Sequence, residues 1–282
     1  MKIKEAVSHG TELLEKAGIC EAKIDAFLLF EAVTGISRAE FFLNPEKELS
    51  PELIEKYNKF IKRRSLHEPC QYILGSCWFY GLEFSVNENV LIPRQDTEVL
   101  VEEALNCVPE NASVLDLCTG SGAIAVAMKA ARPDLTVLAV DLSEAALNVA
   151  KQNAEQNGVD VRFLRSDLFA AIDPSEKFDL IVSNPPYISN TEYEFLMPEV
   201  KEFEPPLALV AGEEGLDIYR RLVAEAPEHL KENGVLLVEI GCSQGGPVSE
   251  LFREAGFRNL KVLKDLAGLD RVVFGRCVLV SQ

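Results

Sequence analysis

The sequence is poor in the residues from which metal centres are usually built. It has three histidines in 282 residues, scattered at positions 9, 67 and 229. No two of its seven cysteines form a Cys-x-x-Cys pair, and an odd, dispersed set of this kind is typical of reduced thiols. These absences argue against a zinc site and against a disulfide framework. The cysteines are Cys20, Cys70, Cys77, Cys107, Cys118, Cys242 and Cys277.

Long apolar runs are also missing. None approaches the roughly 18 residues of a membrane helix. The start, Met1 to Glu5, leads into an amphipathic pattern and lacks the apolar segment of a secretory signal. We therefore expect a cytoplasmic protein that does not bind a membrane. Hydrophobic residues make up 48% and charged residues 26%, which is typical of a globular protein of one large or two ordinary domains.

Basic residues are scarce in the larger part of the chain. Residues 1–93 carry 11 Lys and Arg against 14 Asp and Glu, a net charge of −3. Residues 94–282 carry 17 against 31, a net charge of −14. Because neutralised phosphates supply most nucleic-acid affinity, such a surface would repel DNA. The charge therefore argues against DNA as a partner.

The first 65 residues are predicted to form a helical domain. Apolar residues recur at helical spacing, Gly18 is placed to end a helix, and Ser50 before Pro51 is a typical helix start. Residues 66–93 alternate apolar and aromatic residues around Gly81, which predicts a hairpin linking two domains, with a further short strand at 90–93. A basic cluster, either a solvated helix end or a docking patch, comprises Lys59, Lys62, Arg63 and Arg64.

From residue 94 onward, strand and helix patterns alternate. This order predicts an α/β fold with a Rossmann-like, mostly parallel sheet and helices on both faces. Asp96 is expected to cap the first helix, and the last strand is expected to be antiparallel. The predicted strands are 113–117, 137–141, 159–164, 178–183, 235–240, 260–263 and 272–278.

The first of these strands ends in Asp116-Leu117-Cys118-Thr119-Gly120-Ser121-Gly122 and opens a helix. The glycines allow a tight turn and close approach of a ligand to the backbone. Asp141 ends the second strand, 21 residues after Gly120. An acid at this spacing is placed to accept hydrogen bonds from ribose hydroxyls. The pair predicts a nucleoside site for a nicotinamide cofactor or S-adenosylmethionine.

A second candidate motif, Ser166-Asp167-Leu168-Phe169, follows the third strand. Asp167 could accept a hydrogen bond from an adenine amine, while Leu168 or Phe169 covers the base. The alternative is that Asp167 only caps a helix.

The fourth strand ends in Asn184-Pro185-Pro186-Tyr187. The two prolines fix the backbone and donate no N–H, so the turn is rigid. The Asn184 side-chain oxygen and the Pro185 carbonyl can accept the two hydrogens of a planar N–H₂ group, and the Tyr187 ring can stack on its flat face. An amide or aryl amine held in this way is a better nucleophile. The alternative is an ordinary turn.

Ligands of such sheets bind beyond the carboxyl ends of the strands, where the strand order switches. All the motifs are predicted at that edge. A sulfonium methyl beside a pinned N–H₂ group would allow direct transfer through proximity and orientation, whereas a hydride cofactor gives Asn184 to Tyr187 no function.

With these motifs together, the chain resembles the class I S-adenosylmethionine-dependent methyltransferases. More narrowly, it resembles the protein-(glutamine-N5) methyltransferases that modify peptide-chain release factors, the HemK/PrmC family. Two positions depart from the family pattern: Cys118 stands where a glycine is usual, and Gln95 where a second proline is usual. The other segments that carry the resemblance are Glu68-Pro69, Tyr72-Ile73, Gly75, Phe79, Gly81, Phe84, Leu91-Ile92-Pro93-Arg94, Asp96-Thr97-Glu98, Ile188, Glu204-Pro205 and Ala208-Leu209.

The resemblance implies N5 methylation of the glutamine in the Gly-Gly-Gln motif of release factors. Cys118 to Gly122, Asp141, Asp167, Leu168, Phe169 and Asn184 would hold S-adenosylmethionine. Asn184 to Tyr187 would hold the glutamine, with Asn184, Pro185 and Tyr187 catalytic. The domain 1–65 would dock the substrate, and residues 94–282 would form the methyltransferase domain. The oligomeric state is not fixed, and a monomer is the default expectation.

Three alternatives remain. A DNA adenine-amine methyltransferase shares the Asn-Pro-Pro-Tyr motif but needs a basic groove, which the charge of −14 opposes. A non-catalytic scaffold needs none of Asn184, Pro185 or Tyr187. A nicotinamide oxidoreductase would share only the nucleoside site, and a comparison of which nucleotide stabilises the protein separates it from a methyltransferase.

Overall fold

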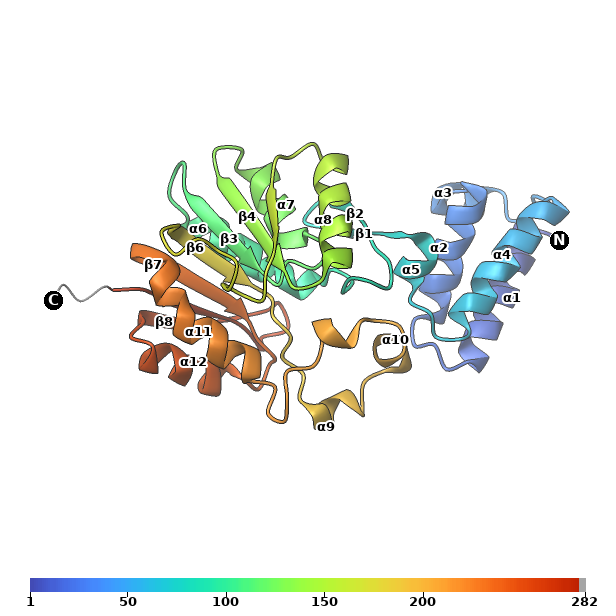
Figure 1. The fold of residues 1–282 in the computed structure, drawn as a ribbon. Helices are drawn as coiled ribbons and strands as arrows, with labels where there is room; N and C mark the ends of the chain where they lie inside the picture. Colours follow the sequence, from blue (N-terminus) through green and yellow to red (C-terminus); the bar gives the residue numbers. More distant parts are fainter. Residues whose placement is uncertain (279–282) are drawn as a thin grey trace. The chain divides into compact units, whose positions relative to one another are not determined.

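The computed structural model describes residues 1–278, and the chain divides into two compact units (Figure 1). The first unit comprises Met1–Gly75 together with the short segment Met197–Phe203. The second comprises Ser76–Leu196 and the chain from Glu204 onward. Within the described residues, no helix is both long and apolar enough to cross a membrane.

The first unit is helical, as the spacing of its apolar residues predicts. Ser50 caps the N-terminus of α4 by accepting a hydrogen bond from the Leu53 N–H at 3.3 Å. The rings of Phe30 and Tyr57 meet edge to face in the core. The helices are α1 (Ile3–Lys16), α2 (Ala22–Thr34), α3 (Arg38–Leu43), α4 (Pro51–Arg64), α5 (Cys70–Leu74) and the short α10 (Pro198–Lys201).

This unit extends beyond residue 65, where the sequence places its end. Cys70 and Ile73 of α5 are buried in its core, so the chain leaves the unit after Gly75. Arg64, from the basic cluster, is also buried: its guanidinium donates to Asp25 at 2.7 Å and to Glu199 at 2.5 Å. Arg64 is therefore an internal crosslink of the helical unit and not part of a surface patch.

The second unit begins with the predicted hairpin, in which β1 (Ser76–Phe79) pairs antiparallel with β2 (Leu82–Ser85). The short strand predicted at 90–93 is wrong. Asn87 starts a turn in which the Val90 N–H donates a hydrogen bond to the Asn87 carbonyl at 3.1 Å. The chain then continues as a loop along the cavity described below.

The central sheet has seven strands in the order β5-β4-β3-β6-β7-β9-β8. The first five of that order run parallel, and β9 is antiparallel to both β7 and β8. This arrangement confirms the predicted fold class. The strands are β3 (Ser113–Leu117), β4 (Thr136–Asp141), β5 (Arg162–Arg165), β6 (Phe178–Ser183), β7 (Leu230–Glu239), β8 (Arg258–Lys264) and β9 (Asp270–Arg276).

Helices cover both faces of this sheet (Figure 1). One face carries α6 (Glu98–Cys107), α7 (Ala123–Ala131) and α8 (Glu144–Gln156), and the other α11 (Asp217–His229) and α12 (Gly245–Glu254). Leu236 and Val238 of β7 belong to the core beneath α11 and α12. Because side chains alternate along a strand, the next residue, Glu239, points toward the α6 face. The remaining short elements are η1 (Gln95–Thr97), α9 (Asn190–Tyr193) and η2 (Pro206–Ala208).

Candidate active site

A cavity opens at the carboxyl ends of the parallel strands, where β3 lies between β4 and β6. The strand order reverses at this point, and open α/β sheets place their ligands there. Four of the residues predicted for the site do not line the cavity: Gly122, Phe169, Pro185 and Tyr187. The predicted residues that do line it are Cys118, Thr119, Gly120, Ser121, Asp141, Asp167, Leu168, Asn184 and Pro186.

The loop from β3 to α7 supplies backbone to one wall of the cavity. Gly122 has φ +81°, and a Cβ there would lie 3.0 Å from the Ala150 Cβ of α8, so only glycine fits. Cys118, the departure from the family pattern, has φ 59° in the same left-handed region. A side chain strains the backbone in this conformation. The loop therefore keeps the path that a glycine would take, with strain at Cys118.

Asp141 joins the end of β4 to this loop. Its carboxylate accepts hydrogen bonds from the Gly120 N–H and the Ser143 N–H, each at 2.8 Å. Burial raises its pKa above the usual range for aspartate, against these backbone hydrogen bonds. Each carboxylate oxygen has a further lone pair, so the group can also accept from a ligand hydroxyl on its cavity side.

Asp116 of β3 is a buried acid just before the same loop. It is 0% exposed and accepts from the Thr119 hydroxyl at 2.6 Å and from the Ala125 N–H at 3.2 Å. Burial raises its pKa to about 7. We infer that Asp116 holds both ends of the loop, a function that the sequence analysis missed because the acid lies inside an apolar strand.

The turn after β5 separates its three predicted residues. Leu168 lines the cavity in a left-handed conformation with φ 49°. Phe169 turns away, and its buried ring stacks on His229 with 4.6 Å between centroids. Asp167 lines the cavity and pairs with Arg221 at 2.9 Å. Of the two apolar candidates, only Leu168 is placed to cover a base in the cavity.

The Asn-Pro-Pro-Tyr turn is held in place from several directions. Ser183, just before it, donates through its hydroxyl to the Leu117 carbonyl at 2.7 Å. The Tyr187 carbonyl accepts from the Gln244 side-chain amide at 3.0 Å, and burial raises the pKa of its phenol to about 12. The Ile188 N–H donates to the Leu209 carbonyl at 2.8 Å. The turn is therefore a rigid part of the sheet edge.

Two side chains from other elements meet Asn184 at the end of β6, and one of them, Thr97, also lines the cavity. Its Nδ2 donates to the Thr97 Oγ1 of η1 at 3.2 Å. Ser183 lies opposite Val238 in the parallel register, which brings Glu239 beside Asn184. Burial raises the pKa of Glu239 to about 7, although hydrogen bonds from Thr97 and Asn184 and the charge of Arg271 lower it. Neither Thr97 nor Glu239 was assigned a role from the sequence.

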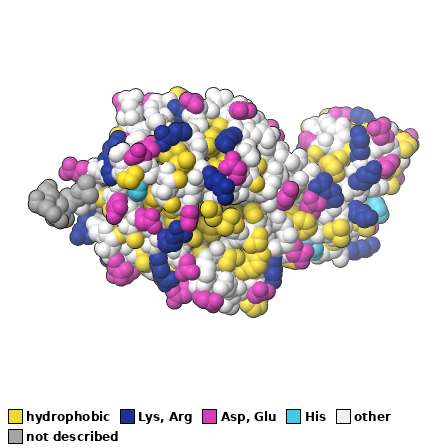
Figure 2. Space-filling view, viewed as in Figure 1, with side chains coloured by type: hydrophobic (Ala, Val, Ile, Leu, Met, Phe, Trp, Pro, Cys, Tyr) yellow, Lys and Arg dark blue, Asp and Glu magenta, His cyan; other side chains and the backbone are white. Residues whose placement is uncertain are grey.

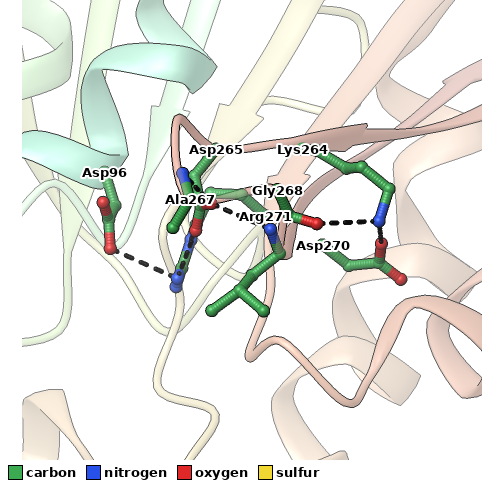
Figure 3. Close-up of polar contacts among 8 residues, drawn as sticks. Asp96, Lys264, Asp265, Ala267, Gly268, Asp270 and Arg271 are labelled. Atoms are coloured by element: carbon green, nitrogen blue, oxygen red, sulfur yellow. Dashed lines mark hydrogen bonds and ion pairs between the residues drawn. The ribbon is translucent and has the colours of Figure 1, made fainter.

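Asp96 does not cap α6, and that prediction is wrong. The N-cap position falls at Thr97, whose side chain makes no capping hydrogen bond. Asp96 instead pairs with Arg271 of β9 at 3.2 Å, and Arg271 also pairs with Asp265 at 2.9 Å. Figure 3 shows the Arg271 side chain extending between these two carboxylates. The ion pair attaches η1, and with it Thr97, to the first residues of β9.

Another ion pair joins two segments that carry the family resemblance. Arg94 pairs with Glu204, which is 3% exposed, across 110 residues of sequence. Pro93, Arg94, Pro205 and Leu207 all line the cavity. The pair therefore fixes two loops at the cavity mouth.

The surface of the second unit has no continuous basic face in the view of Figure 2, where Lys and Arg side chains are interspersed with Asp and Glu. This distribution agrees with the net charge of −14 for residues 94–282. Among the described residues, no group of three or more His, Cys, Asp or Glu side chains is placed to hold a metal ion.

Comparisons with known proteins agree with this geometry. Family models match residues 5–75, as a PrmC N-terminal domain, and residues 95–199, as a methyltransferase small domain. The chain is 44% identical, over 97% of its length and 96% of the relative's, to a release factor glutamine methyltransferase of Geobacter sulfurreducens. It is 42% identical, over 98% and 99%, to one of Koribacter versatilis. A methyltransferase structure from Pyrococcus furiosus, 19% identical, has a TM-score of 0.54 over 71% of this chain and 91% of its own, and shares the fold.

Proposed function

The chain belongs to the family of release factor glutamine methyltransferases, and we propose that it methylates a peptide-chain release factor. The methyl donor is S-adenosylmethionine, and the acceptor is the side-chain nitrogen (N5) of the glutamine in the factor's Gly-Gly-Gln motif. The observation that carries this proposal is the position of Asn184, whose amide lies at the cavity with its nitrogen bonded to Thr97. Its oxygen is then left to accept a hydrogen from a substrate amide.

The residues on the β3–β4 side of the cavity suit the cofactor. Asp141 offers an acceptor for ribose hydroxyls, Gly120 and Gly122 keep the loop close to the cavity, and Leu168 offers an apolar surface to the adenine. S-adenosylmethionine supplies an electrophilic methyl group on its sulfonium. Asp167, already paired with Arg221, would accept from the adenine amine with its remaining lone pairs.

The residues at the end of β6 act on the glutamine. The Asn184 oxygen accepts one of the amide hydrogens at the cavity, so positive charge that develops on the nitrogen is stabilised where it forms. The Pro185 carbonyl as the second acceptor stays a prediction, because Pro185 is buried and does not line the cavity. The ring of Tyr187 is half-buried against the apolar core and does not line the cavity, so its stacking on the amide plane stays a prediction. The rigid turn holds the nitrogen in line with the methyl group, and its contribution is largely one of orientation.

Transfer of a labelled methyl group tests this proposal. The protein, S-adenosylmethionine labelled in its methyl group and a purified bacterial release factor should yield a labelled factor. A factor with the Gly-Gly-Gln glutamine replaced by alanine is the control and should stay unlabelled. Absence of label in the intact factor, or equal label in the control, would refute the assignment.

The helical unit is proposed to dock the release factor. It exposes two neighbouring apolar side chains of α3, Phe42 at 69% and Leu43 at 79%, and exposed apolar groups are typical of protein-binding surfaces. Replacing Phe42 by serine should raise KM for the intact factor. Methylation of a short Gly-Gly-Gln peptide, which cannot reach a docking surface, should stay unchanged. An unchanged KM for the intact factor would exclude Phe42 from docking.

The protein would carry out this reaction in the cytoplasm, where release factors act. That location rests on the proposed substrate and stays a prediction, which fractionation of cells that produce the protein would test.

A further inference from the structure

Glu239 is a buried acid that methyl transfer to an amide does not itself require. Its side chain is 1% exposed, and Oε2 has no hydrogen-bond partner among residues 1–278. Burying a carboxyl group in this way is unfavourable, and an apolar residue could complete the strand without that penalty. The position therefore needs an explanation in terms of what the carboxylate contacts.

The contacts of Glu239 come from four elements around the end of β7. The hydroxyl of Tyr219 in α11 donates to its backbone carbonyl at 2.6 Å, so the strand end is fixed. The parallel register of β6 and β7 brings Glu239 beside Asn184, whose amide nitrogen donates to Thr97 at 3.2 Å. The side chains that interact with Glu239 through charge or hydrogen bonds are Asp96 and Thr97 of η1, Asn184 and Tyr187 after β6, Tyr219 of α11 and Arg271 of β9.

These contacts determine which way the Asn184 amide points. An ionised carboxylate can only accept hydrogen bonds. The Thr97 hydroxyl can therefore give its proton to Glu239 while its oxygen accepts from the Asn184 nitrogen. The two ends of an asparagine amide have almost the same shape, so only such partners distinguish them. With the nitrogen taken, the oxygen is directed to the cavity.

We propose that Glu239 and Thr97 are positioning residues that hold the Asn184 amide with its nitrogen turned inward and its oxygen toward the substrate. The inference deepens the proposed function and rests on it for the identity of the bound amide. The arrangement of Glu239, Thr97 and Asn184 belongs to the protein alone and can be tested without substrate.

The protonation of Glu239 has a direct consequence. A neutral carboxyl group can donate as well as accept, so it no longer dictates the orientation of its neighbours. Because the pKa of Glu239 lies at about 7, turnover should fall as the pH drops from 8 to 6. The fall should be absent in Glu239→Gln, which has no proton to gain.

Matched substitutions at Thr97 separate positioning from packing. Thr97→Val keeps the shape of the side chain and removes the hydroxyl, whereas Thr97→Ser keeps the hydroxyl. We expect Thr97→Val and Glu239→Gln to lower kcat on the release factor by about tenfold or more. Thr97→Ser should keep most of the wild-type kcat. The Kd for S-adenosylmethionine should change by less than about threefold in all of them, since the affected contact is to the substrate.

Val238→Ala is the control for a general loss of stability, because it shortens the adjacent side chain on the opposite face of the same strand. It should lower the melting temperature and leave kcat unchanged. Three results would each overturn the proposal. They are a wild-type kcat in Thr97→Val, a loss of kcat in Thr97→Ser equal to that in Thr97→Val, and a fall in turnover between pH 8 and 6 that persists in Glu239→Gln.

A substrate-free readout keeps the inference separate from the proposed function. NMR of carbon-labelled glutamate should show the Glu239 titration shifting to higher pH in Thr97→Val, because the hydrogen bond that stabilises the charged form is lost. An unchanged titration would overturn the inference even if the factor is methylated. A shifted titration without methylation by the wild type would sustain it and refute the proposed function.

Discussion

The two sides of the cavity are built in different ways. On the cofactor side, the loop after β3 and the end of β4 present backbone groups, and Asp141 accepts two N–H groups of the chain itself. On the substrate side, Asn184 depends on the side chains of Thr97 and Glu239, which come from other elements. In the proposed assignment, a preformed backbone turn binds the nucleoside, whereas a side chain that needs partners binds the amide.

This difference predicts different responses to mutation. A substitution on the cofactor side should change binding, because it alters the shape of a turn or one ribose contact. A substitution on the substrate side should change turnover and stability together, since the supporting acid is buried. Three substitutions, ordered by expected effect, test the contrast.

The largest expected effect on stability is that of Glu239→Gln. The carboxyl of Glu239 has a folded-state pKa of about 7, raised from 4.5, so stability falls as the pH rises from the lower value to the higher and levels off above pH 7. Glutamine does not ionise. The variant should therefore be more stable than wild type at pH 8 by up to about 3 kcal/mol, and the two should converge near pH 4, below the ordinary pKa of a glutamate. Urea unfolding at both pH values measures this difference.

Two outcomes would contradict that prediction. A variant less stable than wild type at pH 8 would mean that the carboxylate is stabilised by its surroundings. A difference independent of pH would mean that Glu239 does not titrate in this range.

A smaller effect is expected for Asp141→Ala on the cofactor side. Losing the acceptor for ribose hydroxyls should weaken S-adenosylmethionine binding by about 1–3 kcal/mol. Titration calorimetry measures the Kd directly. Asp160→Ala, which removes the same charge from an exposed position before β5, is the matched control and should bind as wild type does. If Asp141→Ala and wild type bind S-adenosylmethionine with equal affinity, Asp141 does not accept hydrogen bonds from the ribose.

The smallest effect is expected for Cys118→Gly. Glycine takes the left-handed φ of 59° without strain, but it loses the packing of the thiol and the restriction of the unfolded chain. The net gain in stability should be at most about 1 kcal/mol, with little change in cofactor affinity. Cys107→Gly, at the end of α6, is the control and should be destabilising, since glycine is unfavourable in a helix. A clear loss of stability in Cys118→Gly would show that packing of the thiol stabilises the fold by more than the backbone strain costs.

The same contrast explains what could be predicted from the sequence. Gly120 and Asp141 are 21 residues apart, and the Asn-Pro-Pro-Tyr motif is contiguous, so their local spacing predicts both halves of the site and the sheet edge that carries them. Thr97 lies 87 residues from Asn184 and becomes its neighbour only through the fold. One feature of the sequence could have identified Glu239: it is an acid near the end of the otherwise apolar strand predicted at 235–240.

The two wrong predictions of secondary structure have a similar origin. The loop at 90–93 has the residues of a strand, but the fold places it along the cavity and not in a sheet. Asp96 has the residue type and position of a helix cap, but Arg271, 175 positions later in the sequence, pairs with its carboxylate. In both cases a tertiary contact overrides a local preference.

The central claim is that Asn184 orients the substrate glutamine, and single-turnover methylation of the release factor by wild type, Asn184→Ala and Asn184→Asp tests it most directly. Asn184→Ala should lose roughly 10²-fold or more in rate, as expected for loss of one group that stabilises developing charge. Asn184→Asp keeps an acceptor and should retain more rate than alanine. It should also bind S-adenosylmethionine at least as tightly as wild type, because its charge favours the sulfonium. Near-wild-type rates in both variants would contradict the claim.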